Sequence, residues 1–424
     1  MRGATRALGA LLVATTLGAA AMHAGLRRAE PAANSVVSAP PPRIRLEFTE
    51  PVEPELSLIV LVTARGDSIP LRVTGDPRDV HAIVAVPPPL GAGAYRVAWR
   101  IVSADGHRIR GDYAFTVGRN AVDGAGAGRR AATRPADSAA IIAAARDIEP
   151  AAAAAAPPFA GLLRGLGVTA LLAFSGLAAL LAWRLPDTGL PPLRAAVLAG
   201  VAASSLLAVH FVVWMSYVAP GAALSAGELS AIMRTWSGRL ELARLLLTLV
   251  GVWFLIRRQL AVAATLGIAA LLASSAIGHP AAIAPALAIP AKAVHLLAAA
   301  IWIGGVLWIA ATDRQHVATP AGVRRVSSLA LISVVLVTLA GMGEALLFLP
   351  GVGALITTTY GQIVLAKAFG TLVLVGFGAW HRRLIETGDE RSSVKLAASV
   401  RRELFVLTAV GVLGGVLSYV SPRL

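Results

Sequence analysis

Two residues in the first quarter of the chain have side chains that could bind one metal ion together. Asp105 and His107 stand two positions apart. In an extended strand such side chains share a face, so a carboxylate oxygen and an imidazole nitrogen could approach the same ion. Taken alone, an Asp-Gly-His sequence also suits an ordinary turn that begins with an aspartate, and this alternative stays open.

His23 is a third candidate ligand in the same part of the chain. Residues 1–22 contain basic residues, then an apolar stretch, then small residues, which is typical of a secretory signal peptide. An amino-terminal histidine would offer a metal its free amine, a nearby backbone nitrogen and its imidazole. Cleavage after Met22 creates this chelate, whereas cleavage before Met22, which the preceding alanines favour, leaves His23 second. An uncleaved anchor helix is the other alternative.

Three further histidines lie within or beside strongly apolar stretches: His210, His279 and His295. Ionisable residues inside a membrane are costly and usually face the interior of a helix bundle. Neutral imidazoles from three helices would make a metal site, although single buried histidines bonded to a carbonyl oxygen are also common. Met342 and Glu344 are weaker candidates, and their helical spacing points them apart, so at most one should contribute.

The composition limits both the class of protein and the ligands for a metal. The chain has 56% hydrophobic residues, 14% charged residues and a mean hydropathy of +0.72, which indicates a membrane protein. It has no cysteine, so disulfides and thiolate sites are excluded. The net charge of +15 does not indicate a nucleic-acid partner, because most Arg and Lys clusters lie between apolar stretches.

Residues 23–118 have the pattern of a β-domain. Short runs of alternating apolar residues are separated by Pro, Gly and Asp. This spacing predicts an all-β sandwich or barrel of the Greek-key, cupredoxin-like or immunoglobulin-like kind. Residues 119–156 are rich in Ala, Gly and Arg without a steady hydrophobic period, which predicts a linker.

Residues 157–424 predict an all-α polytopic membrane domain of about eight transmembrane helices. The expected spans are 160–183, 194–217, 240–256, 259–278, 291–311, 327–349, 362–382 and 403–420. Export of the β-domain would make the first span enter from outside. The Arg-rich connections then lie on the inside, and we expect His316 and His381 to be loop or interfacial residues there. His210, His279 and His295 lie in the outer half of the membrane in this topology.

Several stretches of the β-domain resemble the periplasmic copper-binding protein family CopC. They are His23-Ala-Gly-Leu26, Glu30-Pro-Ala-Ala-Asn-Ser35, Leu46-Glu-Phe-Thr-Glu-Pro-Val52, Val102-Ser-Ala-Asp-Gly-His107, Gly111 and Phe115-Thr-Val-Gly118. The resemblance implies a Cu(II) site formed by His23, Asp105 and His107. Nitrogen and oxygen donors in a tetragonal array suit Cu(II). His81 lies outside the motif and reads as a surface histidine.

The helical part resembles CopD, an inner-membrane copper-resistance family. The resemblance rests on the stretches Thr235-Trp-Ser-Gly-Arg239, Gly278-His279-Pro280, Val294-His-Leu-Leu-Ala-Ala-Ala-Ile-Trp-Ile-Gly-Gly305 and Thr358-Thr-Tyr-Gly-Gln362 with Lys367. The resemblance implies a multi-pass protein of the cell inner membrane with its amino-terminal domain in the periplasm. Its partners would be copper ions, the lipid bilayer and periplasmic copper carriers.

Together these features predict a copper-binding membrane protein that captures Cu(II) in the periplasm and mediates copper transport, in the direction of uptake, for homeostasis or resistance. The oxidation state of copper in the membrane domain stays open. A membrane-anchored protein that sequesters or senses copper is the first alternative. A haem- or copper-dependent oxidoreductase is the second, and we expect no enzymatic activity.

Overall fold

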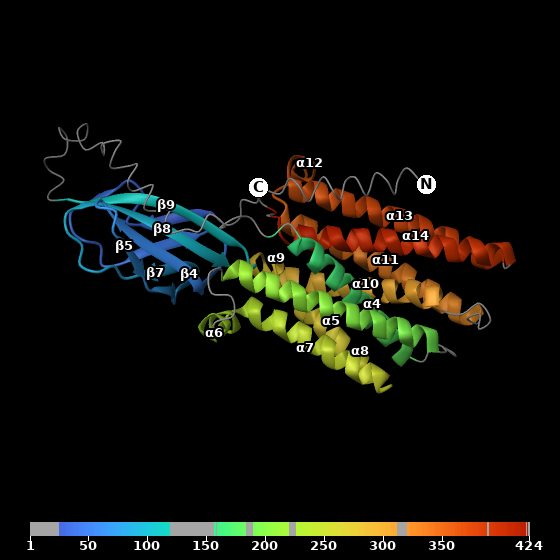
Figure 1. Ribbon diagram of the computed structural model, residues 1–424. Coiled ribbons are helices and arrows are strands. Elements are labelled where there is room, and N and C mark those ends of the chain that lie inside the picture. The colour runs from blue at the N-terminus through green and yellow to red at the C-terminus, as the bar shows by residue number, and fades with distance from the viewer. Residues whose placement is uncertain are drawn as a thin grey trace. The chain divides into compact units, whose positions relative to one another are not determined.

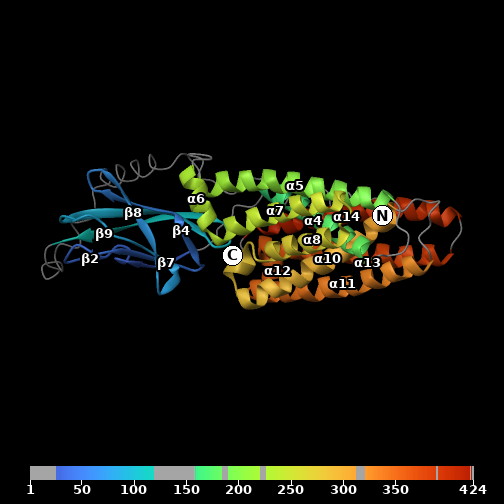
Figure 2. The same cartoon turned by 90° about the horizontal axis from the view of Figure 1, so that it is seen from below.

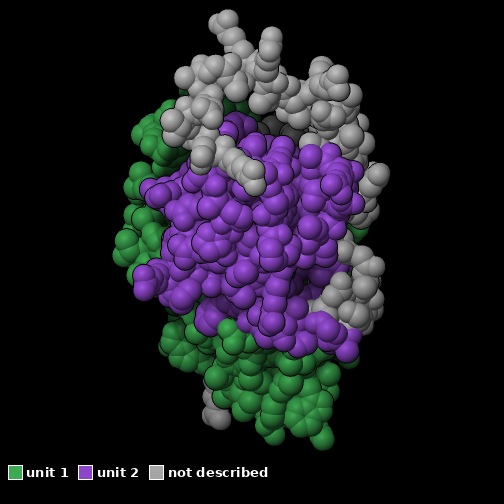
Figure 3. All heavy atoms as spheres, turned by 90° about the vertical axis from the view of Figure 1, so that its left-hand side faces the viewer, with its two compact units in different colours: residues 1–21, 157–215, 237–424 green, residues 22–156, 216–236 purple. Residues whose placement is uncertain are grey.

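The computed structural model describes residues 25–118, 157, 159–183, 190–219, 226–311, 320–387, 390–420 and 422. Two compact units form (Figure 3). The β unit contains residues 25–118 together with the described part of segment 216–236, and the helical unit contains the other described residues. The expected signal peptide, the expected linker and His23 lie outside the described residues.

The β unit contains two sheets (Figure 1). The four-stranded sheet has the spatial order β1 (Leu26–Glu30), β3 (Ile44–Phe48), β7 (Asp79–Ala85) and β6 (Val73–Asp76). The five-stranded sheet has the order β2 (Val36–Val37), β9 (Arg108–Val117), β8 (Gly93–Ser103), β4 (Val52–Thr63) and β5 (Ser68–Leu71). All pairs are antiparallel except β2 and β9, which are parallel.

Alternating side chains of both sheets build one apolar core. In β8, Tyr95, Val97, Trp99 and Ile101 are buried, while the residues between them are half-buried, as the period of two predicts. The ring of Trp99 meets the edge of Phe48 of the other sheet at a centroid distance of 5.1 Å. The all-β sandwich predicted for this part of the chain is confirmed.

The helical unit contains long helices that lie alongside one another (Figure 2). They are α4 (Ala160–Ala182), α5 (Leu190–Val218), α7 (Trp236–Ile256), α8 (Leu260–Ser275), α10 (Pro285–Ala311), α11 (Pro320–Phe348), α13 (Thr359–Thr387) and α14 (Glu390–Leu417). Two short helices, α9 (His279–Ala282) and α12 (Ala354–Thr357), belong to it as well. The end of α5 and α6 (Ala226–Arg234) lie in the β unit.

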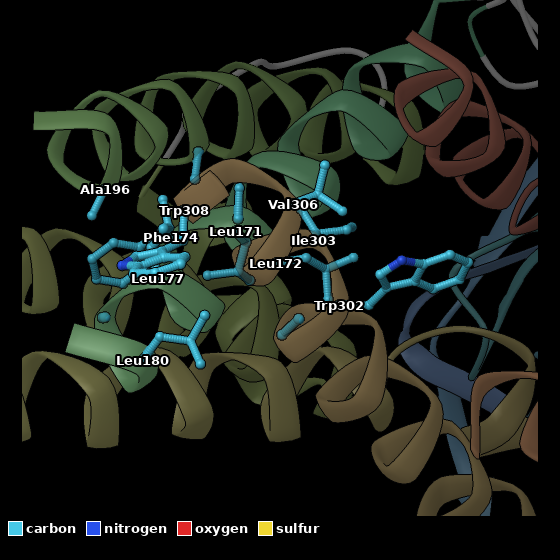
Figure 4. Close-up of a cluster of buried hydrophobic side chains, with 14 of the residues drawn as sticks. Leu171, Leu172, Phe174, Leu177, Leu180, Ala196, Trp302, Ile303, Val306 and Trp308 are labelled. Carbon is cyan, nitrogen blue, oxygen red and sulfur yellow. The ribbon is translucent and has the colours of Figure 1, made fainter. Parts of the chain in front are cut away.

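Helix α4 is the central helix of this unit and packs against α8, α10 and α14. Figure 4 shows Leu171, Phe174 and Leu177 of α4 beside Val306 and Trp308 of α10, and all five are buried. A helix that is apolar around its whole circumference is expected at the centre of a bundle rather than at its edge.

Two glycines allow α4 and α10 to approach closely. A Cβ on Gly176 of α4 would overlap the carbonyl oxygen of Ala300, and a Cβ on Gly304 of α10 would lie 2.5 Å from the carbonyl carbon of Gly176. Small residues at a helix contact let the two backbones meet in this way. The backbones of α4 and α10 therefore meet at these two glycines.

Five of the eight expected spans are helices long and apolar enough to cross a membrane, within the part of the chain that is described. They are Ala160–Ala182, Pro191–Val218, Pro285–Ala311, Arg325–Phe348 and Thr359–His381. The three other expected spans are also helical, but α8 has 16 residues, α7 carries three charged residues between Arg239 and Arg244, and α14 becomes apolar after Glu403. The protein is a multi-pass membrane protein, and the count of eight spans is not confirmed.

Candidate metal sites

The turn between β8 and β9 places Asp105 and His107. The backbone N–H of Ser103 donates to the carbonyl oxygen of His107 at 2.8 Å, and the N–H of Gly106 donates to the carbonyl oxygen of Ser103 at 2.8 Å. Gly106 has a φ of 88°, in the left-handed region that glycine enters at little cost. The expectation that Asp105 and His107 share the face of an extended strand was wrong, because this tight turn brings them together instead.

The two side chains form a buried pair. Asp105 is 5% exposed and His107 is 1% exposed. The Nδ1 atom of His107 lies 2.7 Å from the Oδ2 atom of Asp105. The other carboxylate oxygen accepts hydrogen bonds from the hydroxyl of Ser103 and, at 3.1 Å, from the backbone N–H of His107. The turn therefore holds a carboxylate oxygen and an imidazole nitrogen close enough together to bind one metal ion.

His81 lies in a different part of the β unit. Its side chain is 42% exposed, and its Nδ1 atom lies 3.3 Å from Asp79 Oδ1. Its position on β7 and its exposure fit the expectation of a surface histidine.

An arginine and two aspartates form an ion cluster beside His81. Arg45 donates to Asp76 at 2.8 Å and to Asp79 at 2.7 Å. The hydrogen bond from Arg45 lowers the pKa of Asp76. The pKa of Asp79 is lowered by hydrogen bonds from the backbone N–H and then the ring of His81, followed by the charge of Arg45. The carboxylates in turn raise the pKa of Arg45. This cluster is a source of pH-dependent stability for the β unit.

Tyr217 contacts the residue that follows His107, a contact that sequence reasoning missed. The backbone N–H of Arg108 donates to the hydroxyl of Tyr217 at 3.3 Å, and Nη1 of Arg108 donates to the Tyr217 carbonyl oxygen at 2.7 Å. The guanidinium also lies 5.5 Å from the centroid of the tyrosine ring. Nothing in the local sequence around Tyr217 signals this long-range contact.

The helical unit contains a cavity of about 170 Å³. Its ionisable lining residues come from six helices: Arg164 (α4), Arg244 (α7), His279 (α9), Lys292 and His295 (α10), Glu344 (α11), and Tyr360 and Lys367 (α13). Ionisable groups inside a membrane domain usually mark a substrate or ion pathway. The cavity is thus the candidate functional site of this unit.

Two of the three candidate membrane histidines, His279 and His295, line this cavity. The Nδ1 atom of His295 lies 3.1 Å from the carbonyl oxygen of Val337. The ring of His279 lies with its centroid 5.9 Å from that of Tyr360 and 6.3 Å from that of Phe348.

The third histidine, His210, lies outside the cavity lining and is fully buried in a polar cluster. Its Nε2 atom lies 2.8 Å from the Tyr419 hydroxyl, and its Nδ1 atom lies 3.8 Å from Glu241 Oε2. Among the described residues of the helical unit, no three histidine or carboxylate side chains bring ligand atoms within 4.8 Å of one another. A shared copper site of His210, His279 and His295 remains a prediction.

The two weaker candidates point in different directions, as their spacing indicates. The side chain of Met342 is exposed on the surface of α11, whereas Glu344 lines the cavity. Glu344 is therefore the one of the two that could act together with His279 and His295.

His381 differs from its expected place in a loop or at the interface. It is 8% exposed within α13, and its Nδ1 atom lies 3.1 Å from Oε2 of Glu403 in α14. A buried imidazole needs a polar partner, and the long continuation of α13 provides one on the neighbouring helix. His316 lies outside the described residues.

A β-sandwich with a buried Asp–His pair, on one chain with a multi-pass helical unit, defines a membrane-anchored protein with metal-ligand side chains in both units. Residues 26–118 match the CopC domain family, and residues 320–417 match the family Copper resistance protein D. Matches to both families thus occur in one chain.

Relatives cover both parts of the chain. The Copper transport protein CutJ of Bacillus subtilis (strain 168) is 27% identical over 401 residues, which cover 87% of this chain and 70% of CutJ. Protein YobA of Escherichia coli (strain K12) is 37% identical over 97 residues, covering 22% of this chain and 78% of YobA. Copper resistance protein C of Escherichia coli is 38% identical over 103 residues, which cover 22% of this chain and 81% of that protein.

The chain belongs to the CopC family through its β unit, and its residues 320–417 are similar to the CopD family. Copper is accordingly the metal expected for its CopC domain.

Proposed function

We propose that this protein captures Cu(II) through its CopC domain on the periplasmic side of the inner membrane and transports copper inward through its helical unit. The observation that carries the proposal is the buried Asp105–His107 pair within a CopC domain, on one chain with a membrane bundle whose cavity is lined in part by ionisable side chains. Sequence similarity to a copper transport protein over 87% of the chain supports it.

The soluble site would use His23, Asp105 and His107 as its ligands. The turn already holds the carboxylate of Asp105 and the imidazole of His107 side by side, which lowers the entropy that copper binding must overcome. The ligands must be unprotonated to bind copper, so protons compete with the metal for this site. His23 would complete a nitrogen and oxygen donor set of the type that Cu(II) prefers.

Within the helical unit, His279, His295 and Glu344 would bind copper in transit. Each lines the same cavity, and together they offer nitrogen and oxygen donors. The sequence contains no ATP-binding motif, phosphorylated-Asp motif or Cys-Pro-Cys element, so the proposed passage is driven by the electrochemical gradient or is facilitated.

Copper uptake into vesicles tests the proposal against the alternative of sequestration. The purified full-length protein would be reconstituted into liposomes that contain a copper-sensitive dye in the lumen. Transport predicts a dye signal that grows with time beyond one copper ion per protein. Sequestration predicts binding of copper to the outside of the vesicles with no signal from the lumen, and that result would contradict the proposal.

A further inference from the structure

The cavity of the helical unit is lined by four basic side chains and one acidic side chain. Arg164, Arg244, Lys292 and Lys367 supply the positive charges, and Glu344 supplies the negative one. Arg164 is 7% exposed and Arg244 is 1% exposed. Charges withdrawn from water in this way need partners, because the desolvation of an ion is unfavourable.

The two arginines share a single carboxylate. Arg244 contacts Glu241, and Nη1 of Arg164 lies 4.0 Å from the other oxygen of the same carboxylate. The Nε and Nη1 atoms of Arg244 are buried and have no hydrogen-bond partner among the described residues. One carboxylate therefore leaves part of the donor capacity of the two guanidinium groups unused.

The two lysines have no carboxylate partner in the described part of the chain. The Nζ atom of Lys292 donates to the carbonyl oxygen of Ile277 at 3.1 Å, and Arg164 reaches the same oxygen at 3.5 Å. Neither lysine lies within the 4.0 Å ion-pair distance of Glu344, whose Oε1 atom is also buried without a hydrogen-bond partner there. The acid nearest to the lysines therefore does not pair with them.

The cluster thus holds four basic groups and two acids, Glu241 and Glu344, which leaves an excess of two positive charges when all six groups are ionised. A bare copper cation would increase this excess, whereas an anion would offset it. The basic groups line the same cavity from α4, α7, α10 and α13, so a single small ligand could contact several of them.

We propose that this cavity is a binding site for a small oxyanion, such as inorganic phosphate or a short carboxylate. Guanidinium groups present paired N–H donors that match the oxygens of such anions, and ammonium groups add point charges. The volume of about 170 Å³ is comparable with the roughly 150 Å³ that accommodates a six-carbon ring in an engineered cavity, so an ion of this size fits.

A bound oxyanion would also explain how a copper cation could pass a cavity lined by basic side chains. This step rests on the proposed function. The oxygens of the anion can bind both the basic side chains and Cu(II), so copper could pass as a complex of lower positive charge. Binding of the anion alone does not depend on copper transport, so the two proposals can fail separately.

The test is isothermal titration calorimetry of the purified, copper-free, full-length protein in detergent, in a buffer whose own anion is a bulky sulfonate. Sodium phosphate and sodium succinate are the probes, and sodium chloride at the same ionic strength is the comparison. We expect one saturable site for at least one of the two oxyanions. Separate titrations with phosphate and with succinate show whether the site binds a phosphate, a carboxylate or both.

Lys292→Met and Lys367→Met should each weaken oxyanion binding at least about tenfold, as expected for the loss of one charged hydrogen bond. Arg402→Met, which removes an exposed charge from α14, is the matched control and should leave the affinity unchanged. Lys367→Arg keeps the charge and should preserve binding if Lys367→Met fails to fold. Absence of saturable binding to the unmodified protein, binding of chloride alone, or equal affinities of the cavity variants and Arg402→Met would each overturn the proposal.

Discussion

The Nδ1 atom of His107 lies 2.7 Å from the Oδ2 atom of Asp105, in a hairpin turn from which both side chains point into buried surroundings. The hairpin turn thus places a carboxylate and an imidazole side by side. This geometry leads to separate predictions for His107, for Asp105 and for the fold of the β unit.

Replacing His107 by alanine should weaken Cu(II) binding by the full-length protein by at least about a hundredfold, because a nitrogen ligand of a tetragonal site is lost. A titration with a competing copper chelator, in which the EPR signal of protein-bound Cu(II) is monitored, measures the change in affinity. His81→Ala is the control, because His81 is an exposed histidine that pairs with Asp79. Similar losses in the two variants would mean that the ligands have been wrongly assigned.

Asp105→Asn keeps the shape of the side chain but removes its charge and one acceptor for the imidazole. We expect Cu(II) affinity to fall by about 10- to 100-fold, whether Asp105 binds the metal or orients His107. Asp112→Asn, at a carboxylate that is 46% exposed and paired with Arg96, should have little effect. Unchanged affinity in Asp105→Asn would remove this residue from the site.

The ion cluster of Arg45 and Asp76 should make the stability of the β unit depend on pH in the acid range. Because the pKa of Asp76 is lowered in the folded state, its contribution is fully present above the unfolded value of about 3.9 and is lost as the pH falls through the folded value. Arg45→Met should therefore reduce the free energy of unfolding at pH 6 and have a smaller effect near pH 2.

Urea unfolding of a fragment spanning residues 23–118 at several pH values measures this difference. Arg72→Met, at an exposed arginine, is the control and should be neutral throughout. A cost of Arg45→Met that does not change with pH would show that Arg45 stabilises the fold by packing rather than by its ion pairs.

Gly176→Ala should destabilise the helical unit, although alanine in a helix interior is usually favoured over glycine by about 1 kcal/mol. The new Cβ would overlap the carbonyl oxygen of Ala300, so α4 and α10 would have to move apart. Gly343→Ala on α11 is the matched control, because nothing lies within 4 Å of the Cβ it would add. Thermal unfolding in detergent should show a lower midpoint only for Gly176→Ala, and equal midpoints would contradict the close crossing.

His279→Ala and His295→Ala should each reduce copper accumulation in cells to below about a tenth of the normal level, because each removes a donor from the cavity that copper is proposed to cross. Cu(II) capture by the CopC domain should persist in both variants. His316→Ala, in the expected inside loop, serves as the control. Normal accumulation in a membrane-inserted double variant would leave these histidines with a structural role alone.

Periodicity and composition in the sequence were sufficient to predict the class of each part of this protein. The alternation of apolar residues in runs such as Tyr95 to Ile101 predicted a β-sandwich, and the long apolar runs predicted a membrane bundle, because both patterns record which faces are buried. The Asp-Gly-His motif likewise marked Asp105 and His107, since the motif is local and its residues remain neighbours in the fold.

Only the tertiary structure decided how residues far apart in the sequence are paired. It placed His279 and His295 at one cavity, paired His210 with Tyr419 and His381 with Glu403, and directed four basic side chains toward the same space. The sequence could not predict these pairings, because hydrophobic periodicity shows which face of a helix is buried but not which helix packs against it. That choice depends on side-chain fit between helices, such as the approach of α4 and α10 at Gly176 and Gly304.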